Sequence, residues 1–200
     1  MIQGIVFDCD GTLADTMPAH WQAWRAVVSR HGIAFSEERF YALGGVPTRH
    51  ILQMLAKEQN LSIDAQAIAI EKEQAYLERL THVAPVEIVV QVARAHYGKI
   101  PMAVASGGTR DVINMVLTRL NIRDLFGAVV TSEDVQHQKP APDIFLEAAR
   151  RIGVPPHLCS GYEDTDLGME AIRSAGMKAI DVRDMLAGRR YFPSEKGARS

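Results

Sequence analysis

Five short apolar runs separated by stretches of helical periodicity are the feature that most constrains the fold. The runs are Gln3–Phe7, Ile100–Ala105, Ala128–Thr131, Leu158–Gly161 and Met177–Val182. Each is apolar rather than alternating, which is the pattern of a strand covered on both faces. The helical patterns between them are Val86–Tyr97, Arg110–Leu120, Asp143–Ile152 and Leu167–Ala175. This alternation predicts an α/β fold, with a parallel sheet and helices on both of its faces.

Residues 15–81 interrupt the alternation, because only helical patterns are found there. The helices expected in this segment begin near Pro18 and after Ser36, and span about Thr48–Glu58 and Asp64–Leu80. Thr16 is placed to cap the first helix, and Phe35, Ser36 and Phe40 have the spacing of a hydrophobic staple around an N-cap. We therefore predict a discontinuous core domain, residues 1–14 and 82–200, with an inserted α-helical cap domain, residues 15–81. The last residues, from about Gly188 to Ser200, are expected to form a loose tail.

Composition excludes several classes of protein. With 22 basic and 24 acidic residues the net charge is −2, whereas nucleic-acid binding needs a concentrated basic surface. No run approaches the roughly 20 apolar residues that span a bilayer, and no basic segment precedes the first strand, so we expect neither a membrane anchor nor a signal peptide. Cys9 and Cys159 are expected to be reduced thiols in a cytoplasmic protein. No heptad or long apolar stripe demands a dimer, so we expect a monomer.

Two aspartates follow the first predicted strand. Ligands of open parallel sheets bind outside the carboxyl ends of the strands, and side chains at i and i+2 point to the same side, so Asp8 and Asp10 should lie close together. Two close carboxylates repel each other unless a cation or strong donors compensate. A calcium loop fails on spacing, because Ala19 stands where the bidentate Glu is required. A simple Asp-Gly turn remains an alternative to a catalytic pair.

Polar residues also follow three later predicted strands. Ser106 and Gly107 open a helix, where free backbone N–H groups suit a phosphate. Lys139 lies at a turn before another helix, and Glu163-Asp164 begin an acidic cluster. Each has an ordinary explanation: loop residues, a surface lysine, and acids favoured by the dipole of a helix start. Their occurrence together, each at a strand end, favours a shared site.

The combination resembles the haloacid dehalogenase-like hydrolase superfamily over nearly the whole chain. The resemblance rests on the D-x-D-G-T segment, followed in order by Ser106, Lys139 and the acidic pair. More narrowly, Asp8–Trp24, Gly45–Pro47 and Lys139–Gly168 are similar to the beta-phosphoglucomutase and small sugar-phosphatase group, which includes fructose-1-phosphatase-like enzymes. It implies a Rossmann-like core with an inserted helical cap and a Mg²⁺-dependent phosphoric monoester hydrolase.

The resemblance also implies roles for individual residues. Asp8 would be the nucleophile that forms an aspartyl-phosphate, and Asp10 the acid and base. Mg²⁺ would be held by Asp8, the backbone carbonyl of Asp10 and Asp164, with Glu163 close by or ligating through water. The residues implied to bind the phosphoryl oxygens are Thr12, Ser106, Gly107 and Lys139.

Three cap residues, His20, Arg49 and Lys72, are similar to residues that hold a phosphate or hydroxyl in the mutases of this group. The alternatives are a structural histidine and two solvated cations. Trp21 and Trp24 are expected to pack within the cap.

Two reactions of a sugar phosphate are considered, hydrolysis and the isomerisation that a mutase catalyses. A mutase holds two phosphates, and the similar mutases carry a small polar and then a basic residue where this chain has Gly108 and Thr109; Arg110 comes one position late. This favours hydrolysis of a small phosphorylated metabolite such as a hexose 1-phosphate. The alternative is a beta-phosphoglucomutase that interconverts β-glucose 1-phosphate and glucose 6-phosphate. Dehalogenation needs neither Mg²⁺ nor the acidic pair, and a non-catalytic binding module would not need the intact set, so neither is favoured.

Overall fold

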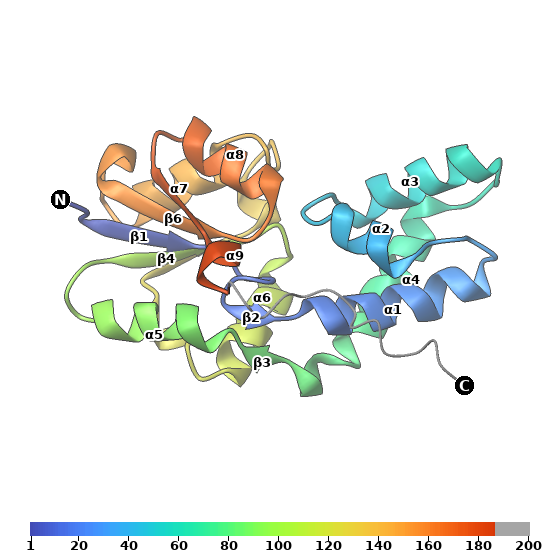
Figure 1. Ribbon diagram of the computed structural model, residues 1–200, viewed down its shortest axis with the longest axis horizontal. Coiled ribbons are helices and arrows are strands. Elements are labelled where there is room, and N and C mark those ends of the chain that lie inside the picture. The colour runs from blue at the N-terminus through green and yellow to red at the C-terminus, as the bar shows by residue number, and fades with distance from the viewer. Residues whose placement is uncertain (187–200) are drawn as a thin grey trace.

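The computed structural model describes residues 1–186 and contains the predicted parallel sheet. The sheet has five strands in the order β5-β4-β1-β6-β7 (Figure 1). The strands are β1 (Gly4–Phe7), β4 (Met102–Ala105), β5 (Ala128–Val130), β6 (Cys159–Glu163) and β7 (Lys178–Asp181). All neighbouring pairs in this sheet are parallel, which confirms the predicted fold class. The predicted tail lies outside the described residues.

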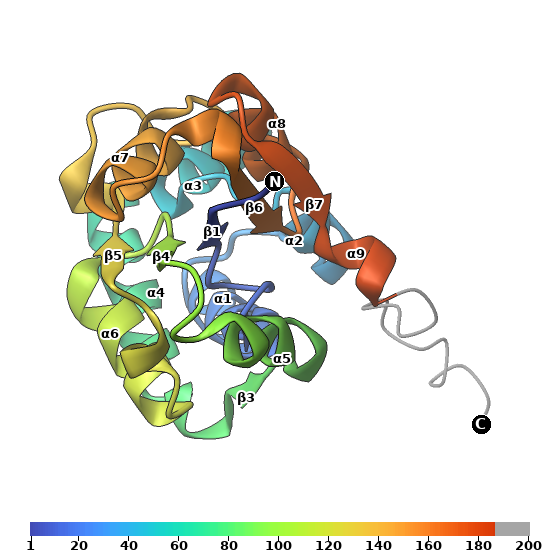
Figure 2. The same ribbon diagram turned by 90° about the vertical axis from the view of Figure 1, so that its left-hand side faces the viewer.

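Helices cover both faces of the sheet because successive strand residues point to opposite sides. Ile5 and Phe7 of β1 pack with α5 (Glu87–His96) and α6 (Arg110–Arg119), whereas Val6 packs with α7 (Asp143–Arg151) and α8 (Asp166–Ser174). Figure 2 shows these two helical layers on either side of the strands. A short α9 (Val182–Met185) follows β7, and 3₁₀ helices span Leu80–His82, Arg123–Leu125, Ser132–Asp134 and Pro156–Leu158.

A separate group of helices lies beyond the carboxyl ends of the strands (Figure 1). It consists of α1 (Met17–Arg30), α2 (Glu37–Ala42), α3 (Thr48–Gln59) and α4 (Ala65–Leu77). Ser36 accepts a hydrogen bond from the backbone N–H of Arg39, and the rings of Phe35 and Phe40 lie 6.4 Å apart, so the predicted staple is present. Trp24 is buried within this group of helices, as predicted, and Trp21 is partly buried against the same core. None of the helices within residues 1–186 is long and apolar enough to cross a membrane.

Two local predictions for this segment were wrong. Thr16 stands at the N-cap of α1, but its backbone is helical and its side chain makes no capping hydrogen bond. The segment from residue 15 is also not purely helical, although the sequence predicted only helices there. Residues 14 and 15 form strand β2 (Ala14–Asp15), which pairs antiparallel with β3 (Ala84–Pro85). Strands of two residues have no periodicity that a sequence pattern could show. This strand pair lies beside the two points where the chain passes between the sheet and the cap helices. The domain boundaries after residues 14 and 81 stay a prediction.

The close approach of β6 to α8 gives a test of the packing. A Cβ atom on Gly161 would lie 2.8 Å from Cδ1 of Ile172, which is fully buried. We expect Gly161→Ala to lower the free energy of unfolding by about 1–3 kcal/mol, because the added methyl overpacks this contact. Gly127→Ala is the control, since a Cβ there would meet only the Met102 carbonyl oxygen, at 3.8 Å. Chemical denaturation measures the free energy of unfolding of both variants. Equal values for Gly161→Ala and Gly127→Ala would contradict the close packing of Gly161 against Ile172.

Candidate active site

A cavity of about 420 Å³ lies between the carboxyl ends of the strands and the cap helices. The sheet side of its lining includes Asp8, Asp10, Ser106, Lys139 and Glu163, which were predicted from sequence to share a site. The cap side is mainly apolar, with His20, Lys72, Glu73 and Tyr76 as polar exceptions among residues of α1 and α4. The strand ends and the cap therefore enclose one site.

Lys139 connects the first and fourth of the predicted strand ends. Its Nζ atom lies 2.6 Å from Oδ1 of Asp8 and 2.7 Å from Oε2 of Glu163, with the Lys139 side chain only 9% exposed. Burial alone would lower the pKa of Lys139, but the charges of Asp8 and Glu163 raise it well above its ordinary value. The ammonium is therefore charged at neutral pH and holds Asp8 in place.

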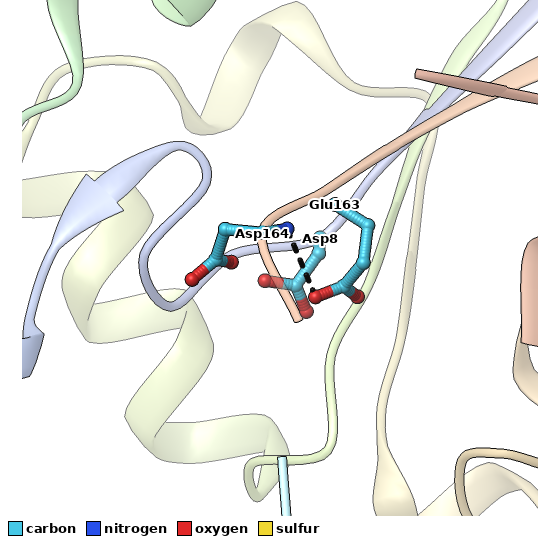
Figure 3. A group of neighbouring side chains, drawn as sticks. All are labelled: Asp8, Glu163 and Asp164. Atoms are coloured by element: carbon cyan, nitrogen blue, oxygen red, sulfur yellow. Dashed lines mark hydrogen bonds between the residues drawn. The ribbon is translucent and has the colours of Figure 1, made fainter. Parts of the chain in front are cut away.

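The second carboxylate oxygen of Glu163 holds this side chain in place through hydrogen bonds. Its Oε1 atom accepts hydrogen bonds from the backbone N–H of Asp164 (3.1 Å) and from the N–H (2.9 Å) and hydroxyl (2.8 Å) of Thr165. The first of these bonds is drawn in Figure 3. A Cβ on Gly168 would overlap the Glu163 carboxylate. Both oxygens of Glu163 are thus occupied by protein donors, so Glu163 orients Lys139.

Three carboxylates meet beside this bridge. Asp8, Glu163 and Asp164 each place one oxygen within 4.8 Å of the others (Figure 3). The hydroxyl of Thr12 donates to Oδ1 of Asp164 at 2.9 Å. Gly11, with φ +85°, allows this approach, because a Cβ there would collide with the Asp164 carboxylate.

The charges of this acidic cluster are not balanced by the protein alone. Burial, followed by the charge of Glu163, raises the pKa of Asp8 well above its ordinary value and that of Asp164 to about 7. Hard divalent cations prefer such all-oxygen ligand sets. The cluster therefore fits the Mg²⁺ expected from sequence. The carboxylate of Asp10 is not part of it, in keeping with a ligand role for its backbone carbonyl alone.

Asp10 faces the cap instead. Its Oδ2 accepts a hydrogen bond from the Ser106 hydroxyl at 3.4 Å, and its buried Oδ1 lies 3.6 Å from Nε2 of His20. Nζ of Lys72 donates to Nδ1 of His20 at 2.8 Å, and the His20 ring stacks on Tyr76 with centroids 3.7 Å apart. A chain of polar groups thus runs from α4 through α1 to Asp10.

The charge states along this chain follow from burial. Burial and the neighbouring Lys72 lower the pKa of His20, so the ring is neutral. With Nδ1 accepting from Lys72, the proton of the neutral ring is on Nε2 and points toward Asp10. Burial alone would raise the pKa of Asp10, but the nearby Nε2–H of His20 and the charge of Lys72 hold it below its ordinary value. Lys72 is only 3% exposed, which removes the solvated-surface interpretation of this lysine.

The loop after β4 forms the remaining wall. Ser106 is buried and accepts a hydrogen bond from the backbone N–H of Gly108 at 3.2 Å, and Gly107 lines the cavity directly before α6. Ser106 and Gly107 therefore lie at the wall where the sequence predicts phosphate binding.

Two arginines that the sequence analysis considered for phosphate binding lie outside the cavity. Arg49 is exposed and lines a separate surface groove with residues of α3 and the α3–α4 connection, so the structure does not bring it to the cavity. Arg110 bonds to Oδ1 of Asp134 at 2.6 Å and to the carbonyl of Val129, and is likewise absent from the lining.

Sequence reasoning missed several residues of the lining. Tyr76 and Glu73 lie on α4 with Lys72, and Thr165 and Gln138 lie next to predicted site residues. Tyr76 follows Lys72 by four residues and shares its helix face, so that spacing could have revealed it.

The five-stranded parallel sheet, the helical cap and the lysine-bridged carboxylates define a Rossmann-like α/β core with a capped candidate active site. Residues 5–182 match the model of the haloacid dehalogenase-like hydrolase family, and the chain belongs to this family.

Comparison with individual proteins gives closer similarities. The chain is 40% identical over 180 residues to the fructose-1-phosphate phosphatase YqaB of Escherichia coli, covering 90% of this chain and 96% of that protein. It is 28% identical over 190 residues to the beta-phosphoglucomutase of Bacillus subtilis, covering 90% and 83%. Among solved structures, the beta-phosphoglucomutase of Clostridium difficile is similar with a TM-score of 0.78 and 26% identity, covering 90% and 84%.

Asp164→Asn tests the electrostatics of the acidic cluster. The folded-state pKa of about 7 lies above that of an unfolded Asp, so the metal-free protein should lose stability as the pH rises toward about 7. At about pH 8 with EDTA, we expect Asp164→Asn to increase the free energy of unfolding by at least about 1 kcal/mol. Millimolar Mg²⁺ should raise the melting temperature of the wild type but not of the variant. An equal Mg²⁺-dependent shift in both proteins would exclude Asp164 as a ligand.

Proposed function

We propose that this protein is a Mg²⁺-dependent phosphatase that hydrolyses small sugar phosphates through an aspartyl-phosphate on Asp8. The observation that carries the proposal is the separation of two carboxylates into different surroundings: Asp8 bonds to Lys139, and Asp10 lies between Ser106 and His20. Two carboxyl groups with different partners can take different roles, one as nucleophile and one as acid and base. The similarity to a fructose-1-phosphate phosphatase supports this assignment.

Asp8 attacks phosphorus in the proposed first step. Lys139 bonds to its Oδ1, and the ammonium favours the ionised carboxylate that a nucleophile requires, against the burial and the charge of Glu163 that raise the pKa of Asp8. Mg²⁺ held beside Asp8 would favour the ionised form in the same way. Lys139, Ser106 and Gly107 then face the phosphoryl oxygens, where positive charge and N–H or O–H donors stabilise the transition state. Thr12, predicted from sequence as a fourth phosphate-binding residue, does not line the cavity, and its hydroxyl instead holds Asp164.

Asp10 moves the protons. The pKa of Asp10 is low in the substrate-free protein, and the negative charge of a bound phosphate raises it, so Asp10 takes up a proton from solvent as the substrate binds. It donates this proton to the leaving sugar oxygen as the bond from phosphorus to that oxygen breaks, and in the second step removes one from the water that attacks the aspartyl-phosphate. His20, held by Lys72, orients the Asp10 carboxylate from the cap. The apolar cap side of the cavity limits the access of other water molecules while the sugar is bound.

Mg²⁺ would be held by Asp8, Asp164 and the backbone carbonyl of Asp10. Bound there, it would neutralise charge on the phosphoryl group. Glu163 contributes indirectly, since its oxygens are bonded to Lys139 and to the backbone after β6.

The positions of two arginine side chains favour hydrolysis over the mutase reaction. Arg49 and Arg110, the residues considered for a second phosphate, lie outside the cavity lining. The mutase remains the second candidate, because the chain is also similar to beta-phosphoglucomutases in sequence and fold.

We also propose a monomeric, cytoplasmic enzyme that acts on a small phosphorylated metabolite rather than on nucleic acid or a membrane. Its core would comprise residues 1–14 and 82–200, and its cap residues 15–81.

A panel of sugar phosphates tests the proposal. We expect Mg²⁺-dependent release of phosphate from fructose 1-phosphate and other hexose 1-phosphates, and at least about a 10³-fold loss in kcat for Asp8→Asn, because an amide cannot replace the nucleophile. Circular dichroism of Asp8→Asn checks that it is folded. Conversion of β-glucose 1-phosphate to glucose 6-phosphate with little phosphate release would favour the mutase, and unchanged turnover in Asp8→Asn would exclude the mechanism.

A further inference from the structure

The cap side of the cavity has a distinctive balance of charge. Among the described lining residues, Glu73 is the single carboxylate that the cap contributes, and Lys72 is its single permanent cation. The two follow each other on α4, yet Nζ of Lys72 lies 3.5 Å from Oε2 of Glu73. Because His20 is neutral, the net charge of this wall is close to zero.

The ammonium of Lys72 already has partners. It donates to Nδ1 of His20 and lies 5.3 Å from the ring centre of Tyr76 and 6.0 Å from that of Trp24. Burial lowers the pKa of Lys72, and the charge of Glu73 opposes this effect. A second anion at this wall would therefore compete with Glu73 for a buried cation that His20 also uses.

On the sheet side, no spare positive charge remains among the described lining residues. Lys139 is shared between Asp8 and Glu163, and Arg49 and Arg110 lie away from the cavity. A second phosphate, which carries about −1.5 to −2 charges at pH 7, would thus enter beside a carboxylate without a matching cation.

We propose that Glu73 is a specificity-determining residue that restricts the cavity to phosphate monoesters with an uncharged, hydroxylated leaving group and rejects bisphosphates. The proposal rests on the phosphatase function proposed above and defines its substrate class. Glu73 has a side chain 39% exposed, so its carboxylate reaches solvent and is placed to accept hydrogen bonds from hydroxyl groups of an incoming sugar. The same charge repels a second phosphate.

The test compares Glu73→Gln, which removes the charge, with Glu73→Asp, which keeps it. We expect Glu73→Gln to raise the ratio of kcat/KM for fructose 1,6-bisphosphate over fructose 1-phosphate about tenfold, through KM. Its KM for the monophosphate should rise, because one charged acceptor is lost. Glu73→Asp should keep the ratio near that of the wild type.

Glu71→Gln is the matched control on the same helix. Glu71 pairs with Arg30 and His31 and does not line the cavity, so this change should leave the ratio unaltered. The proposal would be overturned if Glu73→Gln left the ratio of kcat/KM for the bisphosphate over the monophosphate unchanged. It would also be overturned if Glu73→Asp or Glu71→Gln shifted this ratio as much as Glu73→Gln does.

Binding separates this proposal from the phosphatase function. In the Asp8→Asn background, calorimetric titration with both sugar phosphates gives Kd values without turnover. We expect Glu73→Gln to tighten bisphosphate binding relative to monophosphate binding about tenfold. Failure of the wild type to release phosphate from any monoester would refute the phosphatase function, whereas an unchanged Kd ratio would refute the role of Glu73.

Discussion

The buried ammonium of Lys139 between Asp8 and Glu163 is the interaction on which the rest of the site depends. The parallel register of β1 and β6 sets Phe7 opposite Tyr162, and the N–H of Asp8 donates to the Tyr162 carbonyl. The two carboxylates therefore leave the sheet side by side. Burying such charges costs several kcal/mol per ion unless each is paired and hydrogen-bonded. Both oxygens of Glu163 are bonded, so Lys139 has a fixed anchor on one side and the proposed nucleophile on the other.

Asp10 links the two halves of the molecule. It follows β1 in the core and contacts Ser106 there, while His20, which is held by Lys72, reaches it from the cap. The position of the cap helices thus bears directly on the group proposed to transfer protons. In the same wall, Glu73 modifies the charge that a substrate meets, so proton transfer and substrate selection are both connected to α4.

Much of the fold and the core of the site could be predicted from the sequence. Apolar runs covered on both faces identify the parallel strands, and the position of Asp8, Lys139 and Glu163 after such runs brings them to one edge of the sheet. Strand direction and register bring Asp8 and Glu163 together, whereas Lys139 reaches them from the segment between β5 and α7.

Other features depend on side-chain direction and tertiary packing. Arg49 and Lys72 are both cations on predicted cap helices, but only Lys72 enters the cavity. Glu73 next to a lysine has the pattern of a solvated helix surface, and its place in the cavity wall follows from how α4 packs against α1. The two-residue strands β2 and β3 are too short to have a sequence signal.

The stereochemical course at phosphorus tests the central claim, that Asp8 receives the phosphoryl group. The measurement uses an isotopically chiral thiophosphate ester of the sugar, hydrolysed in labelled water. Transfer to Asp8 and then to water comprises two in-line displacements, each with inversion. We therefore expect net retention of configuration at phosphorus. Net inversion would mean that water attacks the substrate directly, and would contradict a covalent intermediate on Asp8.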